Sequence, residues 1–226
     1  MISSMYSFRI SVAINFVANY IGWSLSPVGL TGGIGSGKST ASKFLHNGLN
    51  IEIVDADAIA RCLVKRGSSC YSTILKRFGP EILDPVSAEI DRQALGRMIF
   101  SDRAKKAELE RITHPRILLE MLRQLVSARV RGKEVVLDVP LLLEKRSFPL
   151  LYLLCNECIC IDASEQNQKT RLLARNPEHS MGEIEARISS QLKRDDRLQL
   201  ADYIINNDGQ IEHLFQQLRQ YFIDKE

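Results

Sequence analysis

The residues from Gly32 to Ser39, GGIGSGKS, match the spacing G-x-x-x-x-G-K-[ST] without a mismatch. Glycines at this spacing let successive backbone N–H groups converge on phosphate oxygens, and a helix that follows adds the positive end of its dipole. We expect Lys38 to reach the β- and γ-phosphates, and Ser39 to hold the Mg²⁺ that bridges them. The pattern predicts a binding site for a nucleoside triphosphate.

The remaining amides and hydroxyls of this loop are expected to complete the phosphate site. The predicted nucleotide-binding residues of the loop are Gly33, Gly35, Ser36, Gly37, Lys38, Ser39 and Thr40. The alternative is a glycine turn with a chance lysine. A strand pattern before the loop and a helix pattern after it argue against that alternative.

Three classes of protein share such a loop: GTPase switches, motor-type ATPases and small-molecule kinases. The sequence has no Asn-Lys-x-Asp motif of the kind that reads guanine, and no glutamate follows Asp138 in VVLDVP to aim a water. Phosphoryl transfer to a small acceptor is therefore preferred. Asp138 itself either holds Mg²⁺ or simply ends a strand, and the sequence leaves both interpretations open.

A kinase also needs a group beside the acceptor hydroxyl that takes up its proton. The segment VDADAIA offers Asp55 and Asp57. If this segment is extended, the two carboxylates share one face at the carboxyl end of a strand, where ligands bind in open parallel sheets. The alternative is a helix N-cap followed by a surface acid.

The elements that must position these groups alternate between strand and helix patterns. SPVGLTG reads as a short buried strand, KSTASKFLHNGL as a helix, and IEIVDADAIA as a strand that runs into a second helix. A strand–helix–strand unit of this kind predicts a parallel sheet with helices on both faces.

The rest of the chain divides into a helical segment and further strands. Residues 59–130 show helical periodicity without a strand, which predicts a helical insertion. The predicted later elements are strands at EVVLDVPLLLE and CICIDA, a charged helical stretch over 165–200, a strand at ADYIINNDG and a closing helix at IEHLFQQLRQYF.

Composition limits the partners and the compartment. A net charge of +3, with dispersed basic residues, does not favour nucleic acid. The five cysteines do not suggest the disulfide framework of a secreted protein, so a cytoplasmic location is expected. Cys155, Cys158 and Cys160 have the spacing of a metal-site fragment, but we interpret them as small buried strand residues.

Residues 1–26 form an extension that we leave out of the fold prediction. They carry a single charge, Arg9, and the apolar run 10–26 falls short of the roughly 20 residues that span a membrane. The segment weakly resembles a signal peptide, and the alternative, which we favour, is an upstream start codon or a loosely attached tail. Membrane association is not expected.

Several segments in order resemble the signatures of the dephospho-CoA kinase family. They are VGLTGGIGSGKST, IVDADAIAR, IDRQALGRMIF, THPRI, DVPLLLE and ADYIINNDG, which run from Val28 to Gly209. The resemblance implies a P-loop kinase of the α/β class that has a parallel sheet core flanked by helices, a helical acceptor-binding insertion and a lid. It also implies transfer of the ATP γ-phosphate to the 3′-hydroxyl of dephospho-CoA, the last step of coenzyme A biosynthesis.

The resemblance assigns roles on the acceptor side that spacing alone does not. It selects Asp57 as the base, with Asp55 beside the substrate. Arg92, in a helix that Asp91 is expected to cap, is implied as a contact of the acceptor phosphate, although a surface arginine is equally compatible. His114 is implied at the acceptor site, while His114-Pro115 reads as a helix start.

A lid is expected to bring arginines over the transferring phosphate. Arg171 and Arg175 lie four residues apart on one helix face and are the first candidates, whereas Arg187, Gln191 and Arg194 are expected to share a later helix. The family usually has Arg-Asp where this chain has Arg175-Asn176. By the same resemblance, Asn207 is expected to contact the adenine; the alternative is that it only supplies a turn residue.

The resulting prediction is an ATP- and Mg²⁺-dependent enzyme whose partner is a small-molecule substrate, dephospho-CoA. Its predicted parts are an extension over 1–26 and a kinase domain over 27–226, with an acceptor subdomain at about 60–132 and a lid at about 165–198. A kinase for a nucleoside monophosphate or a sugar, and a nucleotide-dependent binding protein without kinase chemistry, are the competing predictions.

Overall fold

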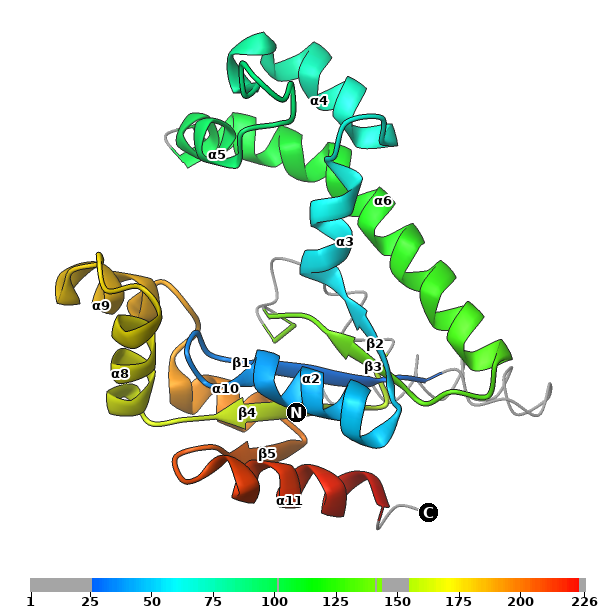
Figure 1. Ribbon diagram of the computed structural model, residues 1–226, viewed down its shortest axis with the longest axis vertical. Coiled ribbons are helices and arrows are strands. Elements are labelled where there is room, and N and C mark those ends of the chain that lie inside the picture. The colour runs from blue at the N-terminus through cyan, green and yellow to red at the C-terminus, as the bar shows by residue number, and fades with distance from the viewer. Residues whose placement is uncertain (1–25, 101, 141, 144–154, 224–226) are drawn as a thin grey trace. The chain divides into compact units, whose positions relative to one another are not determined.

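A computed structural model describes residues 26–223 except 101, 141 and 144–154. Its centre is a sheet of five strands in the order β2-β3-β1-β4-β5 (Figure 1). The strands are β1 Val28–Gly32, β2 Glu52–Asp55, β3 Val135–Asp138, β4 Glu157–Asp162 and β5 Tyr203–Asn206. The sheet is parallel, as predicted.

The register of the sheet brings polar strand ends to one edge. Val28 pairs with Val136 on one side and with Glu157 on the other, and Ile159 pairs with Tyr203. The interior strands are apolar because both of their faces are covered, and all four residues of β3 are buried. The carboxyl ends of β1, β3, β4 and β5 consequently lie at the same edge.

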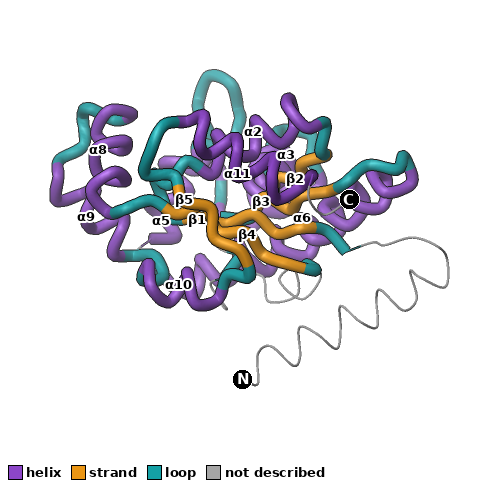
Figure 2. The backbone as a smooth tube through the Cα atoms, turned by 90° about the horizontal axis from the view of Figure 1, so that it is seen from below, coloured by secondary structure: helices purple, strands orange, loops and turns teal. Residues whose placement is uncertain are grey.

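Two helices cover one face of this sheet. Helix α2, Lys38–Leu49, and helix α11, Ile211–Ile223, pack together through stacked rings of Phe44 and Phe215, whose centroids are 4.1 Å apart. Leu45 and Leu214 are buried with the strands in one core cluster. In Figure 2 the strands form a layer with α2 and α11 on one side and α10 on the other. The predicted helix–sheet alternation is confirmed here.

The charged stretch after β4 is broken into three helices: α8 Glu165–Arg175, α9 Met181–Ser189 and α10 Arg194–Leu200. Helix α9 begins with a capping box between Ser180 and Glu183. The expected single helix for Arg187, Gln191 and Arg194 is therefore wrong, because Gln191 lies in the connection between α9 and α10. Periodicity alone did not locate this break.

The chain divides into two compact units. Among the described residues, one comprises those up to Val54 and from Leu125 onward, and the other comprises those within Asp55–Gln124. The second unit contains α3 Ala56–Leu63, α4 Ser69–Phe78, the 3₁₀ helix η1 Pro80–Ile82, α5 Arg92–Phe100 and most of α6 Arg103–Val130. It has its own apolar core, which includes Cys70, Ile74, Phe78, Ile82 and Leu95.

The predicted helix start at His114-Pro115 is wrong. Helix α6 begins after Asp102, whose carboxylate accepts hydrogen bonds from the amides of Ala104 and Lys105, and it runs on with Pro115 inside it. A proline in a helix costs about 3 kcal/mol. Packing of apolar side chains on both sides of Pro115 offsets this cost: Leu109 and Ile112 are partly buried before it, and Ile117 and Met121 are buried after it.

The cysteines of the sheet are buried, as predicted. Cys158 and Cys160 lie in β4, and Cys155 lies just before it. Burial raises the pKa of the Cys155 thiol to about 12 and that of Cys160 to about 11. Burial also raises the pKa of Cys158. None of the helices in the described ranges is both long and apolar enough to cross a membrane.

We predict that Cys62 is the fast-reacting thiol of the folded protein among the five cysteines. It is exposed, whereas Cys70, Cys155, Cys158 and Cys160 are buried. A thiol reacts as its thiolate, so burial and a raised pKa both slow the reaction. Titration with a chromogenic disulfide at neutral pH should release about one equivalent quickly, and Cys62→Ser should abolish that phase. A fast phase that survives in Cys62→Ser would contradict the assignment.

Candidate active site

The phosphate loop connects β1 to α2 at the polar edge of the sheet. Gly35 and Gly37 have backbone φ angles of +76° and +95°, which side-chain-bearing residues rarely adopt. A Cβ atom at Gly37 would also lie 2.1 Å from Nδ2 of Asn207. These two glycines are therefore required by backbone conformation and by close packing.

The amides of this loop fall into two groups. Ile34 donates its N–H to Oε1 of Gln191 over 2.8 Å, and Ser36 donates to the carbonyl of Gly33 over 3.0 Å. Within the described ranges, no hydrogen bond uses the backbone N–H groups of Gly35, Gly37, Lys38 and Ser39. Since α2 also starts without a side-chain cap, this group of amides is available to an anion.

The side chains of the loop also fit a polyphosphate. The hydroxyl of Ser36 is buried and has no hydrogen-bond partner in the described part of the chain. Lys38 forms an ion pair with Asp138, which is buried at the end of β3. Ser39 lies exposed in the first turn of α2, followed by Thr40. Such a set of amides, hydroxyls and one ammonium group fits a phosphate chain with a bound Mg²⁺.

Arg171 supports the phosphate loop through hydrogen bonds to its backbone carbonyls. Its Nη1 donates to the carbonyls of Gly35 and Ser36 over 3.4 and 3.3 Å, and its Nη2 donates to the carbonyl of Asn207 over 2.6 Å. Asn207 is buried, and its Nδ2 donates to the backbone carbonyl of Ser36 over 2.7 Å. Both side chains thus form hydrogen bonds to backbone carbonyls of the loop. This geometry does not test the catalytic role predicted for Arg171 or the adenine contact predicted for Asn207.

Two buried charged groups beside the loop were missed from the sequence. Asp162, at the end of β4, accepts two hydrogen bonds from Arg194, over 2.9 and 2.5 Å. Arg197 is buried, and a Cβ atom at Gly33 would lie 2.6 Å from its Nη1. Arg197 follows Arg194 by three residues in the sequence. The pattern of a charged helical stretch, however, does not distinguish a buried arginine from a solvated one.

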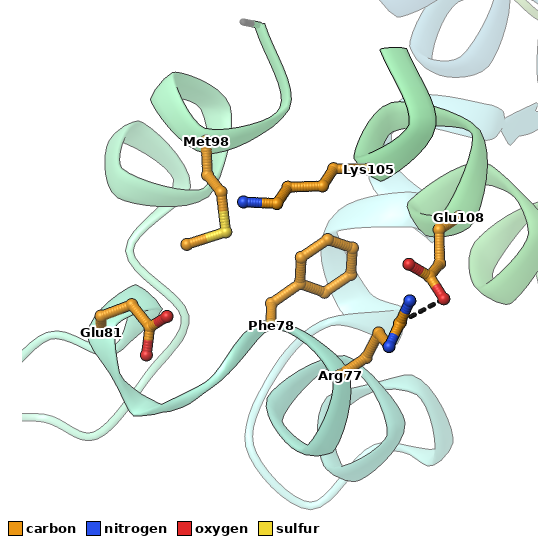
Figure 3. Close-up of a pocket in the computed structure, with 6 residues that line it drawn as sticks. All are labelled: Arg77, Phe78, Glu81, Met98, Lys105 and Glu108. Atoms are coloured by element: carbon orange, nitrogen blue, oxygen red, sulfur yellow. Dashed lines mark hydrogen bonds and ion pairs between the residues drawn. The ribbon is translucent and has the colours of Figure 1, made fainter. Parts of the chain in front are cut away.

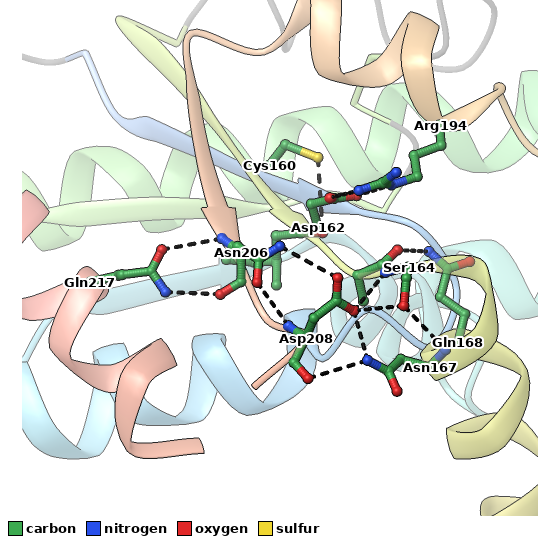
Figure 4. A network of polar contacts seen from close by, with 11 residues as sticks. Cys160, Asp162, Ser164, Asn167, Gln168, Arg194, Asn206, Asp208 and Gln217 are labelled. Atoms are coloured by element: carbon green, nitrogen blue, oxygen red, sulfur yellow. Dashed lines mark hydrogen bonds and ion pairs between the residues drawn. The ribbon is translucent and has the colours of Figure 1, made fainter. Parts of the chain in front are cut away.

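Asp208 ties helix α8 to the turn after β5 (Figure 4). Its carboxylate accepts from the amide and hydroxyl of Ser164, over 2.7 and 2.8 Å, and from the side chain of Asn167 over 2.7 Å. Ser164 in turn caps α8. Burial alone raises the pKa of Asp208, but the hydrogen bonds from Asn167, Ser164 and Asn206 outweigh it and lower that pKa to about 2.

The predicted acceptor residues Asp55, Asp57, Arg92 and His114 belong to the helical unit. Asp55 is the N-cap of α3, with its carboxylate accepting from the amide of Ala58 over 2.9 Å. Asp57 is exposed in the first turn of α3. The expectation of one extended face for the two aspartates is wrong, because the strand ends at Asp55 and the capped helix begins at once.

The other acceptor and lid candidates differ in their surroundings. Arg92 is exposed at the start of α5, which Asp91 caps through the amide of Gln93, as predicted. His114 is half-buried within α6. Arg175 is exposed at the end of α8, and within the described ranges its side chain makes no hydrogen bond or ion pair.

The helical unit also holds a small pocket of about 230 Å³ (Figure 3). An ion pair between Arg77 and Glu108 closes one side of it, and the ring of Phe78 lies between the charged groups and Met98. Lys105 points toward this space from α6. None of the predicted site residues lines the pocket.

The parallel sheet, its strand order and the phosphate loop between β1 and α2 define the chain as a P-loop kinase. A family model for dephospho-CoA kinase matches residues 26–213, and the chain belongs to that family. The role of the family is the last step of coenzyme A biosynthesis.

Individual relatives agree with this assignment. A dephospho-CoA kinase of Bacillus cereus is 40% identical over 185 residues, which cover 81% of this chain and 89% of the relative. One of Aggregatibacter actinomycetemcomitans is 39% identical over 197 residues, covering 87% and 91%. The solved structure of a dephospho-CoA kinase from Campylobacter jejuni superimposes with a TM-score of 0.64 at 25% identity and covers 88% of this chain and 96% of that chain.

We predict that Asp208 makes folding stability depend on acidic pH. Its folded-state pKa of about 2 lies below the value of about 4 for an unfolded aspartate, so its contribution is complete above about pH 4 and is lost as the pH falls toward 2. Asp208→Asn should flatten the dependence of the unfolding free energy on pH in that window. Denaturant titrations at several pH values measure it, and equal slopes in both proteins would contradict the prediction.

Proposed function

We propose that this chain transfers the γ-phosphoryl group of ATP to the 3′-hydroxyl of dephospho-CoA. The observation that carries the proposal is the phosphate loop from Gly32 to Ser39, whose open amides lie within the segment matched by the family model. An enzyme of this kind has a small-molecule substrate, and we place it in the cytoplasm. ATP is the nucleotide implied by kinase family membership.

The phosphate chain of ATP would lie against the amides of Gly35, Gly37, Lys38 and Ser39, with the Lys38 ammonium on its β- and γ-oxygens. Asp138 holds Lys38 beside the loop and keeps its charge in place before the nucleotide binds. The hydroxyl of Ser39 would hold Mg²⁺, which supplies positive charge against the phosphate oxygens. The carboxylate of Asp138 also lies near the loop, but we do not assign it as a ligand of Mg²⁺.

Asp57 is the group that we propose as the general base. Asp55 is occupied as the cap of α3 and lies 3.9 Å from Arg61, whereas the carboxylate of Asp57 makes no hydrogen bond or ion pair within the described residues. The acceptor oxygen forms a bond to the γ-phosphorus, the bond from that phosphorus to the bridging oxygen breaks, and ADP leaves. The proton of the hydroxyl passes to Asp57.

The remaining predicted residues would bind and orient the substrates. Arg175 has no partner in the described chain, so its guanidinium is available for the oxygens of the transferring group. Arg171 would act by keeping the loop carbonyls turned away from the phosphates. We assign Arg92 and His114 to dephospho-CoA, and Asn207 to the adenine of ATP.

We predict that dephospho-CoA is the acceptor that elicits ADP formation. A coupled ADP assay with Mg·ATP should be run with dephospho-CoA, AMP and a panel of sugars, together with mass detection of coenzyme A. The proposal requires turnover with dephospho-CoA and a product heavier by one phosphoryl group. ADP formed with another acceptor alone would replace the proposed substrate, and ADP formation that needs no acceptor would remove the transfer reaction.

We predict that Asp57→Asn lowers kcat by about 10²- to 10⁴-fold, the usual contribution of a positioned general base. ATP binding should be retained, because Asp57 is not part of the phosphate loop. The measurement is steady-state turnover combined with an ATP titration. Glu212→Gln is a matched control, because it removes an exposed acid from the first turn of α11, outside the site. Unchanged turnover in Asp57→Asn would exclude this residue as the base.

A further inference from the structure

We propose that Gln191 is a positioning residue that holds the phosphate loop in its binding conformation before ATP arrives. The inference rests on the proposed function only in taking ATP as the nucleotide. It gives a role to a side chain in the connection between α9 and α10 that does not itself touch the reacting groups.

The contact joins two parts of the chain that lie far apart in sequence. Oε1 of Gln191 accepts from the amide of Ile34 over 2.8 Å. This distance lies within the usual range for an N–H···O hydrogen bond, and the residues are 157 positions apart. Gln191 therefore ties the lid connection directly to the turn of the loop before Gly35.

The segment that carries Gln191 is itself held in place. Arg194 makes two charge-assisted hydrogen bonds to the buried carboxylate of Asp162, over 2.9 and 2.5 Å. Arg197 is buried against Gly33 and donates to the carbonyl of Leu192 over 2.6 Å. These anchors on the residues that follow make Gln191 a fixed support rather than a mobile side chain.

The hydrogen bond does not use an amide from the open group. Gln191 takes the N–H of Ile34, while the amides of Gly35, Gly37, Lys38 and Ser39 have no hydrogen bond in the described chain. The bond can consequently persist when a phosphate chain occupies those amides. We infer that it supports ATP binding and does not compete with it.

Preorganisation is the physical effect of this tether. A loop rich in glycine samples many conformations, and the apparent affinity of a ligand that binds one of them is the intrinsic affinity multiplied by the fraction of molecules in that conformation. A fixed acceptor on Ile34 restricts the start of the loop, so less of the binding free energy is spent on ordering it. Loss of the tether is therefore expected to weaken ATP binding without changing the rate of the chemical step.

Gln191→Met tests this, since it removes the acceptor and keeps a side chain of similar length. The dissociation constant of ATP, measured without acceptor, should rise about tenfold, the size of one lost hydrogen bond. The KM for ATP should rise in parallel, with kcat and the KM for the acceptor within about twofold of wild type. Gln199→Met is the matched control, because Gln199 is exposed on α10.

A second measurement does not depend on the variant being stable. Amide exchange followed by NMR should show the Ile34 N–H of the wild-type protein protected both without and with ATP. Rapid exchange of this amide in the nucleotide-free protein would overturn the proposal. Tighter ATP binding by Gln191→Met would also overturn the proposal, since it would mean that Gln191 competes with phosphate. An unchanged ATP affinity in a folded Gln191→Met variant would overturn it as well.

These outcomes are separate from those of the proposed function. ATP binding and amide exchange are measured without an acceptor, so they retain their meaning if dephospho-CoA is not the substrate. A wild-type protein that fails to phosphorylate dephospho-CoA yet loses ATP affinity on Gln191→Met would support this inference and contradict the proposed reaction.

Discussion

The central constraint on this molecule is that four amides of the phosphate loop, those of Gly35, Gly37, Lys38 and Ser39, have no hydrogen-bond partner among the residues that the structure describes. Unpaired backbone groups are costly when they are removed from water, so the loop needs other contacts to keep its shape. Arg171 and Asn207 hold its carbonyls, and Gln191 and the Gly33 carbonyl take the amides that are not exposed to the ligand. The binding conformation is thereby supported from the outside.

The parallel sheet supplies the places from which these supports come. Asp138 at the end of β3 pairs with Lys38 of the loop, Asp162 at the end of β4 holds Arg194, and Asn207, which contacts the loop carbonyl of Ser36, follows β5. Because parallel strands end at one edge, segments distant in sequence contribute to one site. Asp208 extends the same arrangement to helix α8 by tying its first turn to the turn after β5.

The helical unit achieves its stability by separate means. It has its own apolar core around Ile74, Phe78 and Ile82, and the long helix α6 passes through Pro115 without ending. Asp55 starts the first helix of this unit through a capping hydrogen bond, and this leaves the neighbouring Asp57 with an open carboxylate. A local folding requirement thus separates two acids that the sequence alone did not rank.

The sequence by itself determined the phosphate loop, the strand–helix alternation and the family, because glycine spacing and apolar periodicity are local properties. Only the tertiary structure decided which polar residues brace that loop. Arg197 and Gln191 lie in a charged stretch whose pattern does not reveal burial or partners. The continuity of α6 through Pro115 was likewise decided by burial, since packing on both sides of a proline can outweigh its local cost.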